Sequence, residues 1–332
     1  MNIYLIPTMG SFHLRYPNYN TVSVSDLLSH YSPEAIALAS LTNKEYNSPR
    51  WQDTEEIVLP LSVIPWAKKN NRKIHFVKEP SPDPSAYQDF RRYAQSYPEL
   101  QNKLYQCEVV LRPLEELLAQ ILTVERIIAE VVPILYENQR LEQELLEEGP
   151  ATNWRLERNQ KMAQRILAIA AKSLAVLVEI EDYAFLKQEL EKKANIIEAK
   201  NIEASPKARE RSLLDFAFRI DVANPEGLIE NLEEIASAEA SYHIANILLH
   251  NGYIDDALAK LVKASKGDFG QPYYLPGYLL ARLGQLYDLK ANRNMAKKSY
   301  RGVLALDYAP KEALETARKG LETAFIASQA KI

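Results

Sequence analysis

Residues 174–180, LAVLVEI, form a nearly continuous apolar run that contains several β-branched side chains. A run of this length and composition is typical of a strand covered on both faces, as strands in parallel sheets are. Just before it, Met162, Ile166 and Ile169 recur at helical spacing, while charged side chains occupy the other faces. The sequence therefore predicts that an amphipathic helix leads into a buried strand over residues 155–180.

Earlier apolar runs indicate the rest of a sheet. Short strand-like segments alternate with helical patterns at residues 3–6, 23–30, 35–39, 61–69 and 73–77. This alternation predicts right-handed crossovers and a mainly parallel sheet. We expect the first strand to lie beside the 174–180 strand. Ligands bind at the carboxyl edge of such sheets, so Glu179, Glu181 and Asp182 mark the first place to look for chemistry.

A chain of 332 residues favours two domains over one. Residues 1–200 are predicted to form an α/β domain, with covering helices and a helical hairpin inserted at about residues 85–148. Residues 201–332 are predicted to form an all-α repeat domain, reached through a polar linker or exposed helix end at 194–212. The polar segment 42–60 is unusually long for a loop in a compact domain, which suggests a function.

The second predicted domain contains two similar helix-turn-helix segments, 244–264 and 283–304. Gly252 and Ala291 occupy equivalent positions 39 residues apart. The segments resemble tetratricopeptide (TPR) repeats, whose period is about 34 residues. Such arrays bind a protein or peptide in their concave face. The alternative is an array that only packs against the first domain or forms a homodimer contact. His243 and His250 are interpreted as packing or groove residues.

Composition excludes several classes of protein. A formal net charge of −4 provides no basic face for nucleic acid. No apolar run is long enough to span a membrane. The single Cys107 cannot form an internal disulfide, and the first residues lack a signal-peptide pattern. We therefore expect a soluble, cytoplasmic protein.

Four short motifs carry a family resemblance. They are GSFH at 10–13, SVSDLLSHYSPEAIALA at 23–39, IHFVKEP at 74–80 and ERNQKMAQRI at 157–166. In this order, over about residues 1–200, they resemble the TraB/ChaN-like superfamily, which includes TIKI proteases and erythromycin esterases. The resemblance implies an α/β fold and, in active members, hydrolysis by residues of two GxxH motifs, an acid and an arginine-bearing helix.

This sequence matches only some of the motif residues of the TraB/ChaN-like superfamily. Gly10 and His13 match the first GxxH motif, and Arg158 and Asn159 match the helix. The second strand ends at Leu38-Ala39-Ser40 without the family's acid. The second GxxH motif becomes EIED, with Glu179 in the glycine position and Asp182 in the histidine position. The resemblance therefore implies a degenerate site.

These patterns give a set of candidate residues. If the protein is active, the catalytic residues are His13, Arg158 and Asp182; the ligand-binding candidates are Gly10, Ser11, Glu179, Glu181 and Asn159. A divalent metal would be held by His13, Glu179, Glu181 and Asp182, and this carboxylate-rich set suits Mg²⁺ or Mn²⁺ better than Zn²⁺. The alternative is that His13 caps a turn, Arg158 pairs with Glu157 or Asp182, and the acidic group is a solvated strand end.

Two functions remain open. The first is a non-catalytic protein with a degenerate TraB/ChaN-like domain, which binds a ligand or a protein through its sheet-edge cleft and repeat tail. The second is a metal-assisted hydrolase of peptide or ester bonds that uses His13, Arg158 and Asp182.

Overall fold

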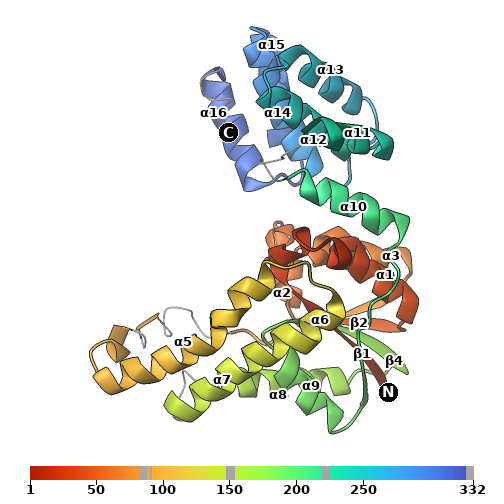
Figure 1. The fold of residues 1–332 in the computed structure, drawn as a ribbon. Coiled ribbons are helices and arrows are strands. Elements are labelled where there is room, and N and C mark those ends of the chain that lie inside the picture. Colours follow the sequence, from red (N-terminus) through yellow and green to blue (C-terminus); the bar gives the residue numbers. More distant parts are fainter. Residues whose placement is uncertain (82–87, 90–91, 147–153, 219–224, 327–332) are drawn as a thin grey trace. The chain divides into compact units, whose positions relative to one another are not determined.

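The computed structural model divides the chain into two compact units, residues 1–208 and 209–332 (Figure 1). It describes residues 1–81, 88–89, 92–146, 154–218 and 225–326. The sequence had placed the domain boundary after residue 200. Within the described ranges, none of the helices combines the length and apolarity needed to cross a bilayer.

The first unit is built on a five-stranded sheet of order β3-β2-β4-β1-β5, in which every pair of neighbours is parallel. The strands are β1 (Asn2–Thr8), β2 (Ala35–Leu38), β3 (Lys73–Phe76), β4 (Ser173–Glu179) and β5 (Asn195–Glu198). The predicted α/β class and parallel sheet are therefore confirmed. So is the predicted neighbour pair, because Ile6 of β1 lies opposite Leu177 of β4.

The interior strand β1 extends past a proline. Pro7 lies inside β1, which continues to Thr8. Proline has no N–H for a ladder bond, so it is tolerated only where that donor is not needed. Neighbouring β5 pairs with β1 only as far as Leu5, which leaves Pro7 paired on the β4 side alone.

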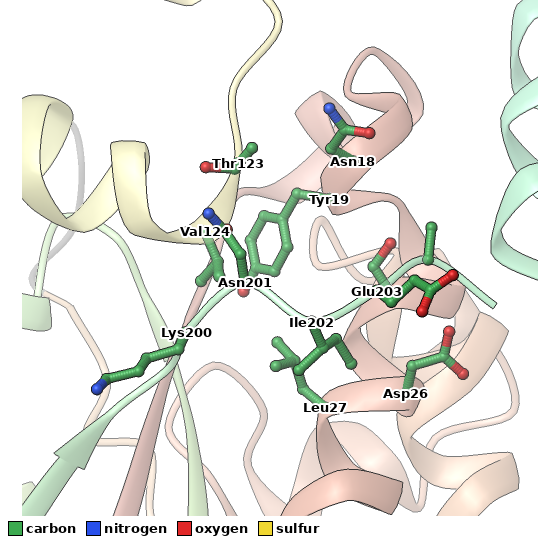
Figure 2. A pocket seen from close by; sticks show the side chains of 12 residues that line it. Asn18, Tyr19, Asp26, Leu27, Thr123, Val124, Lys200, Asn201, Ile202 and Glu203 are labelled. Atoms are coloured by element: carbon green, nitrogen blue, oxygen red, sulfur yellow. The ribbon is translucent and has the colours of Figure 1, made fainter.

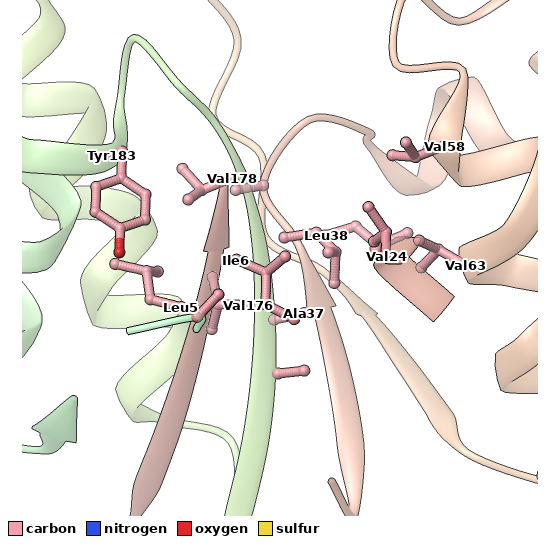
Figure 3. Packing of buried hydrophobic residues seen from close by; sticks show 14 of the residues in the cluster. Leu5, Ile6, Val24, Ala37, Leu38, Val58, Val63, Val176, Val178 and Tyr183 are labelled. Carbon is pink, nitrogen blue, oxygen red and sulfur yellow. The ribbon is translucent and has the colours of Figure 1, made fainter. Parts of the chain in front are cut away.

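Helices cover both faces of the sheet. They include α1 (Thr21–Tyr31), the π-helical turn η4 (Leu59–Val63), α3 (Ile64–Lys69), α8 (Trp154–Leu167) and α9 (Tyr183–Glu191). Figure 3 shows Val24 of α1 and Val63 of η4 on one side of the strands, with Tyr183 of α9 on the other. The strand side chains between them are fully buried, including Val176. Burial on both faces explains the continuous apolar run in β4.

The helical insertion follows β3. It contains α5 (Pro98–Leu118), α6 (Val124–Arg126), the π-helical turn η5 (Ile127–Val131) and α7 (Val132–Leu146). Residues 119–123 separate α5 from α6. Pro133 is the second residue of α7, next to the junction with η5. Leu117 and Val131 belong to the main core, so this part packs within the unit. Both predicted bounds of the insertion, about 85 and 148, lie outside the described residues.

Residues 194–212 are not a simple linker. Their start forms the edge strand β5, and their end lies in α10 (Pro206–Phe216). The prediction missed β5 because four residues, NIIE, with polar flanks carry no distinct period. Pairing with β1 supplies the stability that the local sequence does not show.

The second unit is all helical in its described part. After α10 it contains α11 (Pro225–Ile235), α12 (Ala238–His250), α13 (Ile254–Ala264), α14 (Leu275–Leu289), α15 (Arg293–Leu304) and α16 (Lys311–Glu322). The two predicted helix pairs are α12 with α13 and α14 with α15. Their turns share a backbone feature, because Gly252 and Ala291 both have positive φ, 82° and 57°.

Small residues let the last three helices approach closely. The ring of Tyr300 in α15 is fully buried. A Cβ on Gly284 of α14 would lie 2.3 Å from this ring, and one on Gly320 of α16 would lie equally close. A hydrogen bond of 3.0 Å from the hydroxyl to Asp288 fixes the ring further. These contacts explain why glycine occurs inside two helices, where it otherwise lowers helix stability.

Candidate functional site

A pocket of about 390 Å³ lies beyond the carboxyl ends of β2, β3 and β4. We call it the sheet-edge pocket; it is lined by Ser40, Leu41, Glu45, Ser48, Arg50, Trp51, Asp53, Thr54, Glu55, Glu56, Lys78 and Glu179. Most of these residues come from the long polar segment 42–60, which folds into α2 (Asn43–Tyr46) and the 3₁₀ turn η3 (Trp51–Asp53). Polar side chains at the carboxyl edge of a parallel sheet are the usual setting of a ligand site.

Glu56 is the most buried acid of this pocket, with 6% of its surface exposed. The backbone N–H of Gly10 donates to both of its carboxyl oxygens, each at 3.1 Å. Gly10 has a φ of 55°, so the turn that aims this N–H at Glu56 favours glycine. Burial, together with the charge of Glu179, raises the pKa of Glu56 to about 8. The carboxyl is therefore mainly protonated near neutral pH.

Glu179 ends β4 and faces a buried arginine. The Arg158 guanidinium lies 3.5 Å from one Glu179 oxygen. Burial raises the pKa of Glu179 more than the Arg158 charge lowers it. In register, Glu179 lies opposite Thr8, two residues before Gly10. The ends of β4 and β1 thus hold Glu179 and the Gly10 N–H that binds Glu56.

Arg158, Asn159 and Asp182 form a buried cluster behind this edge. Arg158 makes an ion pair with Asp182 and donates through Nε to the carbonyl of Glu79 at 2.8 Å. Asn159 donates to the other Asp182 oxygen at 2.9 Å. Each of the three residues has at most 5% of its surface exposed. The pairing of Arg158 with Asp182 is the structural alternative that the sequence left open.

His13 is completely buried, and backbone groups occupy both of its ring nitrogens. The N–H of Met9 donates to Nε2 at 3.1 Å, so Nε2 must be the unprotonated nitrogen. Nδ1 carries the proton and donates to the carbonyl of Tyr19 at 2.8 Å. Burial lowers the pKa of His13 to about 4, which keeps the ring neutral at physiological pH. The geometry is that of a histidine that fixes a turn, η1 (Gly10–Leu14).

The predicted metal ligands do not converge. Among the residues that the structure describes, no group of three or more His, Cys, Asp or Glu side chains is arranged to hold a metal ion. His13 has no nitrogen left for a metal, and Asp182 is bound to Arg158 and Asn159. Neither His13 nor Asp182 lines the sheet-edge pocket.

The other ligand-binding candidates differ in position. Glu179 lines the sheet-edge pocket. Gly10 contributes indirectly, because its N–H binds Glu56. Ser11 and Glu181 are exposed and are not among the lining residues. The backbone carbonyl of Glu181 accepts a hydrogen bond of 3.0 Å from Gln139 of α7.

A second, smaller pocket of about 160 Å³ lies near the segment that follows β5. Figure 2 shows Ile202 next to Leu27 of α1, while Lys200 points away from the other labelled side chains. Asp26, the acid on its α1 side, accepts a hydrogen bond of 2.7 Å from Ser205. This pocket therefore offers less space and fewer buried charged groups than the sheet-edge pocket.

Sequence reasoning missed the residues that distinguish the sheet-edge pocket, above all Glu56 and Ser40. The available signal was the length of the 42–60 segment, which contains Glu56. Ser40 lies two residues after the end of β2, and its hydroxyl is buried. No local pattern distinguishes Glu56 from Glu55, because its burial depends on Gly10, 46 residues away.

In comparisons with known proteins, no family model, no curated protein and no solved structure matches this chain.

Proposed function

We propose that this protein is a non-catalytic ligand-binding protein whose site is the sheet-edge pocket. The observation that carries the proposal is the pocket itself, about 390 Å³ of polar-lined space at the carboxyl edge of a parallel sheet. This volume is in the range of sites for small organic molecules, about 300–1,000 Å³. The resemblance to TraB/ChaN-like proteins is part of the same proposal, as a fold whose catalytic groups have been lost.

The hydrogen bonds and ion pairs of the candidate catalytic residues support a non-catalytic role. A general base or metal ligand needs a nitrogen or oxygen that can reach the substrate. Both His13 nitrogens bind backbone groups, and the Arg158 guanidinium binds Asp182 and the Glu79 carbonyl. The alternative proposal, a metal-assisted hydrolase of peptide or ester bonds, requires His13 to release one of these bonds.

The helical unit is proposed to be a TPR-like module that binds a protein or peptide. The matching positive-φ turns at Gly252 and Ala291, 39 residues apart in the sequence, support a repeated helix pair. Arrays of such pairs offer extended surfaces for partners. A homodimer contact is the alternative use of the same surface.

Tryptophan fluorescence tests the ligand-binding proposal directly. Trp51 lines the sheet-edge pocket, whereas Trp66 of α3 donates its indole N–H to Ser29 at 2.7 Å and is not among the lining residues. Polar small molecules are titrated against the wild type, Trp51→Phe and Trp66→Phe. We expect a saturable signal from bound compounds in the wild type and in Trp66→Phe, and a strongly reduced signal in Trp51→Phe.

Two results would contradict the proposal. One is the absence of saturable binding across a library of polar fragments. The other is binding whose signal depends on Trp66 and not on Trp51, since this would place the ligand elsewhere. Circular dichroism of both variants checks that each phenylalanine substitution leaves the fold intact.

A further inference from the structure

We infer that the sheet-edge pocket recognises an organic cation, a small aliphatic amine whose ammonium group lies between Glu56 and Glu179. This inference rests on the proposed ligand-binding function and adds the chemical class of the ligand. It is argued from the charge of the lining residues, from a buried hydroxyl without a partner and from an aromatic side chain.

The lining carries more negative than positive groups. Arg50 pairs with Asp53 at 2.6 Å, and Lys78 pairs with Glu45 at 3.1 Å. These are the two cations among the lining residues, against five acids: Glu45, Asp53, Glu55, Glu56 and Glu179. Arg158, which lies behind the edge, pairs with Asp182 and lies 3.5 Å from Glu179, so two acids share this one cation. An anionic ligand would meet this excess of acidic side chains, whereas a cation would be attracted to it.

Glu56 is almost completely buried, and the charge of the partly exposed Glu179 acts on it. Burying charge without a partner is costly, and the protein avoids part of this cost by keeping Glu56 protonated. The pKa of Glu56, raised to about 8 by burial and by the charge of Glu179, shows that a negative charge is unfavourable at this position. An ammonium group at this place would supply hydrogen-bond donors to both carboxyl groups and would compensate their charge.

The second, independent observation is the unpartnered hydroxyl of Ser40. It lines the pocket and has 2% of its surface exposed, and its hydroxyl has no hydrogen-bond partner in the described part of the chain. A buried hydroxyl without a partner costs free energy, which a bound ligand can recover. An ammonium N–H is a suitable donor to the serine oxygen.

Trp51 completes the set of groups that suit an amine. It lines the pocket, and its ring packs against Tyr46 with centroids 5.1 Å apart. The face of an indole ring attracts cations and also packs against methylene groups. A flexible aliphatic amine has both a cationic ammonium group and methylene groups.

The experiment uses the full-length protein and three matched probes: 1,4-diaminobutane, 1,4-butanediol and succinate. They have chains of the same length that carry positive, neutral and negative ends. Isothermal titration calorimetry is performed on the wild type, Glu56→Gln and Glu179→Gln. Glu34→Gln is the control, because Glu34 is exposed and lies at the opposite edge of the sheet, just before β2.

We expect the diamine to bind, and the diol and the diacid to bind at least about tenfold more weakly. Each pocket variant should weaken diamine binding about tenfold or more, and Glu34→Gln should leave it unchanged. Because Glu179 is less buried than Glu56, Glu179→Gln provides the test if Glu56→Gln does not fold.

The outcomes separate the two proposals. If the diol or succinate binds with a Trp51-dependent signal and the diamine does not, the pocket is a ligand site but the amine inference is wrong. If Mg²⁺ or Mn²⁺ binds in place of the diamine, the inference is also wrong. Diamine binding that survives in both pocket variants overturns the assigned position.

Discussion

Replacing Glu56 with glutamine is expected to remove a pH dependence of folding stability. Glutamine keeps the size of the side chain and an oxygen that accepts the Gly10 N–H, but it cannot ionise. The wild-type carboxyl has its pKa raised from 4.5 to about 8 on folding. Between these values the folded state holds a proton that the unfolded state has lost. Stability should therefore fall as the pH rises through this window.

The size of the effect follows from the same shift. One pKa unit corresponds to about 1.4 kcal/mol. The shift in the pKa of Glu56 on folding therefore sets an upper limit of about 5 kcal/mol on the loss of stability. The Gly10 N–H, which binds both Glu56 oxygens, favours the charged form and is already included in the net shift. A measured loss of about 2–4 kcal/mol would agree with this reasoning.

Urea denaturation at several values between about pH 5 and pH 9 measures the effect. Tryptophan fluorescence is a suitable signal because Trp51, Trp66 and Trp154 all lie in the first unit. Glu55→Gln is the matched control, since it removes the same charge from the exposed neighbouring residue. Wild-type stability that stays constant or rises from pH 5 to pH 8, or an equal flattening in Glu55→Gln, would refute the reasoning.

The remaining predictions concern groups outside the pocket. Gly284→Ala should lower the free energy of unfolding by about 1–2 kcal/mol, because overpacking against Tyr300 exceeds the gain in helix propensity. Gly302→Ala, whose Cβ meets only the end of Leu280, should stabilise by about 0.5–1 kcal/mol, and urea unfolding followed by circular dichroism distinguishes the two. His13→Gln should remove a loss of stability on acidification between pH 6.5 and about 4, since burial lowers the folded pKa and only the unfolded state binds the proton there. An unchanged acid slope in this variant would contradict the buried, neutral histidine.

The sequence predicted the sheet where the pattern was local. The 174–180 run predicted β4 because a strand buried on both faces needs apolar side chains at every position. The short segment NIIE predicted nothing, because the pairing that makes it β5 comes from β1. The GxxH motif led to an expectation of chemistry at His13, but the Met9 and Tyr19 backbone groups bind both ring nitrogens.

Periodicity along the chain was enough to predict the α/β class and the helical segments of the second unit. Which polar groups meet depends on the three-dimensional fold. Glu56 is buried against the Gly10 N–H and close to Glu179, although these residues are far apart in the chain. Burial and charge depend on neighbours in space, so the protonation of Glu56 and the pairing of Arg158 with Asp182 could not be read from residue spacing.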